Sequence, residues 1–209
     1  DSIEAVTGWL ASRGIELEAK FVSYHAAGGT FLPGVRNIMT SSAVAYNSEG
    51  QGKALVDGFI KVFGPGFDGT TVKADAVVGA GEIEIAGIRM VIVPNAEAFE
   101  VEIPEAKAVY MHMLGHDCHS IVAGPAHADA IIANIRQYLD RGFELFLTSH
   151  YVPEGRQDAE EKIAYLENLK TIAAGSSSGA EFRQKVVEAY PVYSGENYLD
   201  MSVGMFFPQ

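Results

Sequence analysis

The middle of this 209-residue chain carries the pattern that most restricts its fold, a series of short strand candidates separated by turns. Glu82-Ile83-Glu84-Ile85 and Glu100-Val101-Glu102-Ile103 alternate charged and apolar residues, which is the period of a strand with one face in water. This spacing predicts an antiparallel meander. Its five strands are expected over residues 72–78, 82–86, 89–94, 97–103 and 107–111, and glycine or proline marks each turn between them.

The segments on both sides of the meander alternate between helix and strand patterns, which is the signature of an α/β arrangement. Before the meander, we expect a capped helix that ends at Gly14, strands over 18–24 and 38–46, and a helix over 48–63. After it, we expect helices over 125–142, 158–174 and 180–189, with a short apolar strand over 143–147 between the first two.

Composition excludes several classes of function. The formal net charge is −12, which argues against nucleic acid or an anionic membrane as the main partner, because binding phosphates requires clustered lysine and arginine. No apolar run is long enough to cross a bilayer. Cys118 is the only cysteine, so an internal disulfide and an all-cysteine zinc site are both excluded. We expect a cytoplasmic protein that takes a small-molecule substrate or ligand.

The stretch from Ala108 to Ser120 holds three of the six histidines together with Asp117 and Cys118. It begins as a buried strand, and if the chain stayed extended, His112, Leu114 and His116 would share one face. The sequence therefore predicts that imidazoles reach the end of a core strand, where α/β proteins place their sites. The alternative is that these histidines cap the strand and form only local hydrogen bonds.

Two further strand candidates also end at a histidine, His25 and His150. If these strand ends converge on one edge, they offer the three or four nitrogen and oxygen ligands that a zinc ion requires. The candidate ligands are His112, His116, His119, Asp117 and His150, but no His-Glu-x-x-His pattern supports them. Cys118 with His119 suggests a nucleophile and a base, but adjacent side chains rarely face each other, so we interpret Cys118 as a packed thiol.

The order of elements resembles the metallo-β-lactamase-fold superfamily of metal-dependent hydrolases. The resemblance covers most of residues 1–175 and rests on layout and on one loop. It is carried by the helix and the strand Lys20-Phe21-Val22-Ser23-Tyr24, the hairpins around Ala86-Gly87, the segment Ile103-Pro104-Glu105 before the strand Ala108–Met111, and the loop Thr148-Ser149-His150-Tyr151-Val152-Pro153-Glu154. It implies an α+β fold, an αββα sandwich, whose first strands we expect to be missing before Asp1. It also implies that His150 matches the last metal histidine of the family.

The metal motifs of that family are degenerate in this chain. Where a His-x-His-x-Asp-His motif is expected, the chain reads Tyr24-His25-Ala26-Ala27-Gly28-Gly29. After Pro94, where the family usually has Gly-His, the chain reads Asn95-Ala96-Glu97. The position of the bridging aspartate falls near His112 or Met113, with Asp117 close by. The resemblance therefore implies an atypical or degraded metal site.

Two functions follow from this resemblance. The first is a hydrolase-like protein whose metal ligands are His112, His116, Asp117 and His150, with His25 as a candidate additional ligand and Asp117 as the catalytic residue. The ion would be zinc or another divalent transition metal, iron or manganese, and would activate a water molecule. The alternative is a catalytically inactive binding or structural subunit of the same fold, with no metal.

The C-terminal segment is too apolar to extend freely into water. We expect one metallo-β-lactamase-like domain over residues 1–175, with residues 176–209 forming a helix and an aromatic tail packed on it or on a second copy in a homo-oligomer. The aromatic residues of this tail are Tyr190, Tyr193, Tyr198, Phe206 and Phe207.

Overall fold

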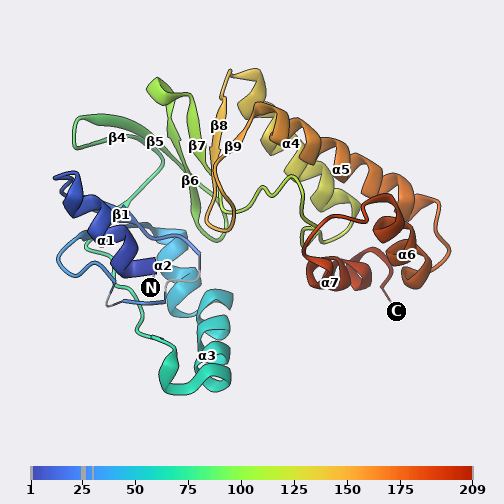
Figure 1. The fold of residues 1–209 in the computed structure, drawn as a ribbon, viewed down its shortest axis with the longest axis horizontal. Helices are drawn as coiled ribbons and strands as arrows, with labels where there is room; N and C mark the ends of the chain where they lie inside the picture. The colour runs from blue at the N-terminus through green and yellow to red at the C-terminus, as the bar shows by residue number, and fades with distance from the viewer. Residues whose placement is uncertain (1, 25–26, 30, 209) are drawn as a thin grey trace. The chain divides into compact units, whose positions relative to one another are not determined.

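The computed structural model describes residues 2–24, 27–29 and 31–208, which form two compact units, residues 1–104 and residues 105–209. Figure 1 traces the helices and strands of each unit along the chain. The first unit contains the helices α1 (Ser2–Ser12), α2 (Ser41–Ser48) and α3 (Gln51–Phe63), a 3-10 turn (Gly64–Gly66), and the strands β1 (Ala19–Phe21), β2 (Arg36–Thr40), β3 (Ala76–Val78), β4 (Gly81–Ile85), β5 (Ile88–Pro94) and β6 (Phe99–Ile103).

A small parallel sheet holds the first three strands. β2 lies between β1 and β3, with Ile38 opposite both Phe21 and Ala76. β2 ends at Thr40, whose hydroxyl accepts the main-chain N–H of Ala43 at 3.2 Å and thereby caps α2. The predicted strand over 38–46 is therefore wrong beyond Thr40, because this side-chain cap starts a helix there.

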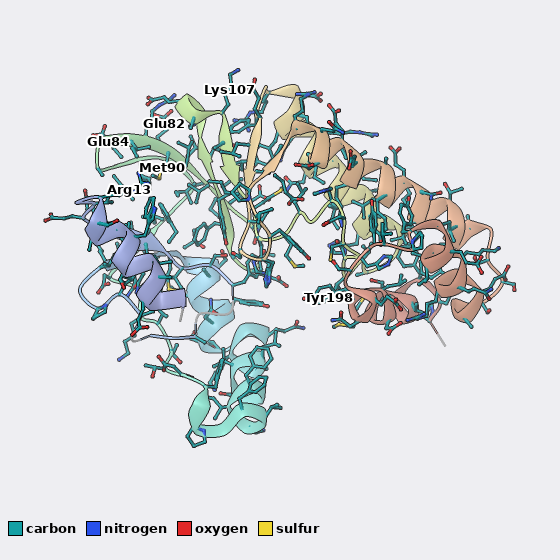
Figure 2. The ribbon with its side chains drawn as sticks, viewed as in Figure 1. Arg13, Glu82, Glu84, Met90, Lys107 and Tyr198 are labelled. Carbon is teal, nitrogen blue, oxygen red and sulfur yellow. The ribbon has the colours of Figure 1, made fainter. Side chains whose placement is uncertain are left out.

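The antiparallel meander has three strands instead of the predicted five. β4 pairs with β5, and β5 pairs with β6, so that Val91 lies opposite both Glu82 and Glu102. Glu82 and Glu84 of β4 are exposed, as their alternation predicted (Figure 2), whereas Glu102 of β6 is buried. The two outer predicted strands, β3 and β7, leave the meander because each pairs in parallel with a strand from elsewhere in the chain.

The second unit is a short sheet with four helices. β7 (Ala108–Tyr110) and β8 (Leu145–Leu147) pair in parallel, and β8 pairs with the two-residue strand β9 (Glu154–Gly155) in the antiparallel sense. The helices are α4 (Pro125–Asp140), α5 (Arg156–Ala174), α6 (Gly179–Ala189) and α7 (Glu196–Phe206), and a 3-10 turn (Pro104–Ala106) precedes β7. Their buried faces form one core, which includes Ile132, Ile135, Leu139, Ile163, Leu166, Leu169, Phe182, Val186 and Leu199.

The C-terminal tail forms a helix that the sequence pattern did not predict. Gly195 adopts a left-handed conformation (φ +79°) immediately before α7, and Gly204 lies within the helix, so the two glycines that suggested a break are accommodated. Tyr190, Phe206 and Phe207 pack against the core of the second unit. Tyr198 lies in the first turn of α7 (Figure 2).

Two expectations concern the chain as a whole. Across residues 2–24, 27–29 and 31–208, none of the helices has both the length and the apolar character that crossing a bilayer requires. The predicted domain boundary at residue 175 stays a prediction, and so does the cytoplasmic location.

Candidate functional site

Two of the predicted metal ligands, His112 and His150, meet where β7 and β8 end. The strands run in parallel with Tyr110 opposite Leu147. Beyond them, the main-chain N–H of Ser149 donates to the carbonyl of His112 at 3.1 Å, so the two segments stay together after the strands end. The imidazole rings approach edge to face, with centroids 4.7 Å apart and an interplanar angle of 80°. The ends of two parallel strands thus deliver both imidazoles to one edge.

His116 lies on a turn and pairs with the carboxylate of Glu154, which is almost fully buried (2% exposed). Glu154 accepts three hydrogen bonds: from the Gly115 N–H at 2.9 Å, from the His116 N–H at 2.8 Å and from the His116 ring Nδ1 at 2.8 Å. The bond to Glu154 raises the pKa of the His116 imidazole against the opposing effect of burial, and the charges of Asp158 and Asp117 raise it further.

The other nitrogen of His116 faces the start of α5. Its Nε2 lies 3.7 Å from Oδ1 of Asp158. Glu161 lies one turn further along α5, and one ligand atom from each of the three residues lies within 4.8 Å of the others. Within the described part of the chain, this is the only group of three or more histidine, cysteine, aspartate or glutamate side chains with the spacing to hold one metal ion.

The predicted extended face of His112, Leu114 and His116 does not form. β7 ends at Tyr110, and Gly115 adopts a left-handed conformation (φ +65°), so the chain turns before His116. Leu114 is buried in the core of the second unit. Sequence alternation predicts a shared face only while a strand continues, and this strand ends too early.

The remaining candidates lie elsewhere. Asp117 is exposed, and its main-chain carbonyl accepts the N–H of Ser194 at 3.2 Å. His119 is buried (1% exposed). His25 lies outside the described residues. The structure thus places His112 with His150 and places His116 with carboxylates of α5, while metal binding by the predicted set and a catalytic role for Asp117 stay predictions.

A buried lysine lies beneath this turn. Lys162 of α5 is 2% exposed, and its ammonium donates to the carbonyls of Gly115 at 2.9 Å and Cys118 at 2.8 Å. Burial lowers the pKa of Lys162 to about 8, against the opposing effects of Cys118, Glu154 and Asp117. Lys162 therefore fixes the histidine-bearing turn to the helix that carries Asp158 and Glu161.

Cys118 is a packed thiol, as the sequence suggested. It is 2% exposed, its thiol donates to the carbonyl of His119 at 3.0 Å, and its sulfur lies 3.1 Å from the hydroxyl of Tyr151. The imidazole of His119 bonds instead to the hydroxyl of Tyr165 at 3.0 Å and packs against Tyr193. Burial lowers the pKa of His119, as the nearby charge of Lys162 also does. These contacts describe a core network, not a thiol–imidazole pair.

The four α5-side residues of this site, Glu154, Asp158, Glu161 and Lys162, escaped the sequence analysis. They lie about forty residues after His116, and charged residues near a helix start usually face water. One signal was present, because Lys162 occupies an apolar position of the stripe that contains Ile163 and Leu166. A lysine at such a position is buried only if it finds acceptors.

In the first unit, the segment that replaces the Gly-His of the family has a structural role. The side-chain oxygen of Asn95 accepts the main-chain N–H groups of Glu97 at 3.0 Å and Ala98 at 2.7 Å. The hydroxyl of Tyr24 also donates to this oxygen at 3.3 Å. Asn95 therefore closes a turn between β5 and β6.

Comparison with protein-family models and with curated protein sequences finds no match. Solved structures do match. The chain superposes on the inverting sec-alkylsulfatase Pisa1 from Pseudomonas sp. with a TM-score of 0.64 and 13% identity, over 97% of this chain and 43% of that one. It therefore spans less than half the length of that enzyme.

Two metallo-β-lactamase structures match more of their own length. The family protein TTHA1429 from Thermus thermophilus matches with a TM-score of 0.62 and 14% identity, over 97% of this chain and 78% of that one. The metallo-β-lactamase from Pontibacter korlensis matches with a TM-score of 0.52 and 13% identity, over 79% and 76%. Identities this low report fold alone, and the fold agrees with the resemblance found in the sequence. The chain has an α+β fold of the metallo-β-lactamase type.

Proposed function

We propose that this chain belongs to a metal-dependent, hydrolase-like protein with an atypical metal site at the ends of β7 and β8. The contact between the rings of His112 and His150 carries this proposal. Two imidazoles that bind one tetrahedral zinc ion through nitrogens at about 2 Å place their ring centroids about 5 Å apart. The observed separation of 4.7 Å is close to that value, so the donor pair fits a divalent ion.

A bound ion at this edge would bring the pKa of a coordinated water near neutrality, which supplies a nucleophile for hydrolysis. His112 and His150 would hold it, and zinc, iron or manganese suits imidazole ligands. The exposed carboxylate of Asp117 is proposed as the catalytic group that accepts a proton from water. We propose a small molecule as the substrate, consistent with a strongly acidic chain that disfavours nucleic acid.

Replacing His150 with alanine is expected to lower the metal content of the protein by about one equivalent per chain, because the proposed site loses one of its two imidazoles. The measurement is elemental analysis of freshly purified protein. The matched control is His127→Ala, an exposed histidine in the first turn of α4, which should retain the wild-type metal content. Wild-type protein without zinc, iron or manganese at near-stoichiometric level would rule out the hydrolase proposal.

A second candidate, a non-catalytic subunit that self-associates, is favoured by apolar side chains left exposed on the tail. Although the tail aromatics pack on their own core, Met201 and Met205 are 53% and 45% exposed. They lie four residues apart on α7 and therefore share one face. Such a face is typical of an interface with a second copy of the chain.

Replacing both Met201 and Met205 with lysine is expected to convert a wild-type homodimer to a monomer, because the change places two charges in an apolar contact. Light scattering coupled to size-exclusion chromatography measures the mass. The double variant Gln184→Lys/Glu188→Lys on the exposed face of α6 serves as the control for added charge. A monomeric wild-type protein would contradict the interface.

A further inference from the structure

We propose that His116, Asp158 and Glu161 form a second binding site for a divalent transition-metal ion, built from different residues than the His112–His150 pair. The three side chains converge from two elements, the turn after β7 and the first two turns of α5. The proposal goes beyond the hydrolase-like function and does not depend on it, because none of these three residues belongs to the strand-end pair.

The spacing of the ligand atoms suits one ion. Two ligand atoms bound to a tetrahedral zinc ion at about 2.1 Å lie about 3.4 Å from each other. His116 Nε2 and Asp158 Oδ1 are 3.7 Å apart, which is long for a direct hydrogen bond and close to the distance across a metal. An oxygen of Glu161 lies within 4.8 Å of both groups. The three donors leave a fourth position for water.

The imidazole is held in the orientation that a metal ligand requires. Glu154 binds Nδ1 of His116 at 2.8 Å, and Glu154 is itself fixed by the main-chain N–H groups of Gly115 and His116. With its proton on Nδ1, His116 directs the lone pair of Nε2 toward α5. A carboxylate that orients a histidine in this way recurs around metal-binding histidines.

The two carboxylates of α5 are also positioned before any ion binds. Oδ2 of Asp158 accepts the N–H of Gly155 at 2.6 Å, which turns Oδ1 toward His116. Glu161 follows three residues later on the same face of the helix, and Gln157 donates to its Oε1 at 2.9 Å. One imidazole nitrogen and two carboxylate oxygens are ligands that zinc and manganese accept.

The test uses the full chain, stripped of metal with a chelator and titrated with Zn²⁺ in a calorimeter. To separate the two sites, the background variant is His112→Ala/His150→Ala, which removes the strand-end pair. We expect this variant to bind one Zn²⁺ per chain. Adding Glu161→Gln to it should weaken binding by more than about tenfold, because one of three ligands is lost.

The matched control is Glu160→Gln in the same background. Glu160 is the adjacent exposed carboxylate of α5, and it pairs with Arg156 at 3.0 Å instead of facing His116. This control should bind Zn²⁺ with the affinity of the background variant. In ¹⁵N spectra of the imidazoles, Zn²⁺ should shift the His116 ring signals when Glu161 is present.

Two results would overturn the second site. One is the absence of Zn²⁺ binding to the folded His112→Ala/His150→Ala variant. The other is equal affinity for the Glu161→Gln and Glu160→Gln proteins. Circular dichroism of each variant verifies that it is folded, and Glu161 is exposed, so its substitution leaves the core intact. Because the strand-end pair is tested through His150→Ala, failure of one site does not affect the other.

Discussion

Replacing Glu154 with alanine is expected to lower the free energy of unfolding by about 3–5 kcal/mol, the usual effect of removing one member of a buried, hydrogen-bonded charge network. Glu154 is 2% exposed, and its two oxygens accept the N–H groups of Gly115 and His116 and the imidazole of His116. Alanine would leave the two main-chain donors without an acceptor in the protein interior. A domain with a typical stability of about 5–15 kcal/mol would lose a large fraction of it.

Urea denaturation followed by far-ultraviolet circular dichroism measures this loss. The control is Glu160→Ala, which removes an exposed carboxylate paired with Arg156 and should change the stability by less than about 1 kcal/mol. The two variants have the same change in side chain and in formal charge, and they lie six residues apart. A loss below about 1 kcal/mol for Glu154→Ala would show that this network does not hold the turn to α5.

Hydrophobic period and turn residues were sufficient to predict most elements of the fold. The helices α4 and α5 have three or more apolar residues at helical spacing, such as Ile132, Ile135 and Leu139, and these residues are buried as expected. The alternation of β4 and β5 around Gly87 likewise predicted a hairpin. Period alone does not determine which strand pairs with which, so β3 and β7 were assigned to the meander although both pair in parallel.

The candidate site was only partly predictable for a related reason. His112 and His150 each follow a recognisable apolar strand, so their delivery to strand ends could be inferred from sequence. His116 could not be placed, because its position depends on the left-handed turn at Gly115 and on a carboxylate 38 residues away. Contacts between distant segments depend on tertiary packing, which one sequence does not specify.

A basic and an acidic side chain stabilise the same turn from opposite directions. Glu154 accepts its N–H groups, while Lys162 donates to its carbonyls at Gly115 and Cys118. Their titration has different consequences. The pKa of His116 is raised, so its stabilising effect is complete below its usual pKa of 6.5 and is lost as pH rises through the higher folded value. Lys162 has the opposite dependence.

The contribution of Lys162 to stability is expected to increase by about 2 kcal/mol between pH 7 and pH 9.5. Burial lowers its pKa to about 8 in the folded chain, whereas the unfolded chain has the ordinary value of 10.5. Between these values the unfolded chain binds more protons than the folded chain, so raising the pH favours folding. A neutral amine still has two N–H groups for the carbonyls of Gly115 and Cys118, so deprotonation removes the cost of burying charge while both bonds remain.

Comparison of the wild type with Lys162→Met isolates this contribution. Urea denaturation at pH 7 and pH 9.5 gives four free energies of unfolding, and the change with pH should be about 2 kcal/mol more favourable in the wild type than in the variant. All other groups, including His116, titrate in both proteins and largely cancel. Lys170→Met, which removes a partly exposed lysine of α5 paired with Asp129, should follow the wild type. An identical pH dependence for wild type and Lys162→Met would mean that Lys162 keeps its proton throughout this range, with the two carbonyls and the nearby carboxylates offsetting the cost of its burial.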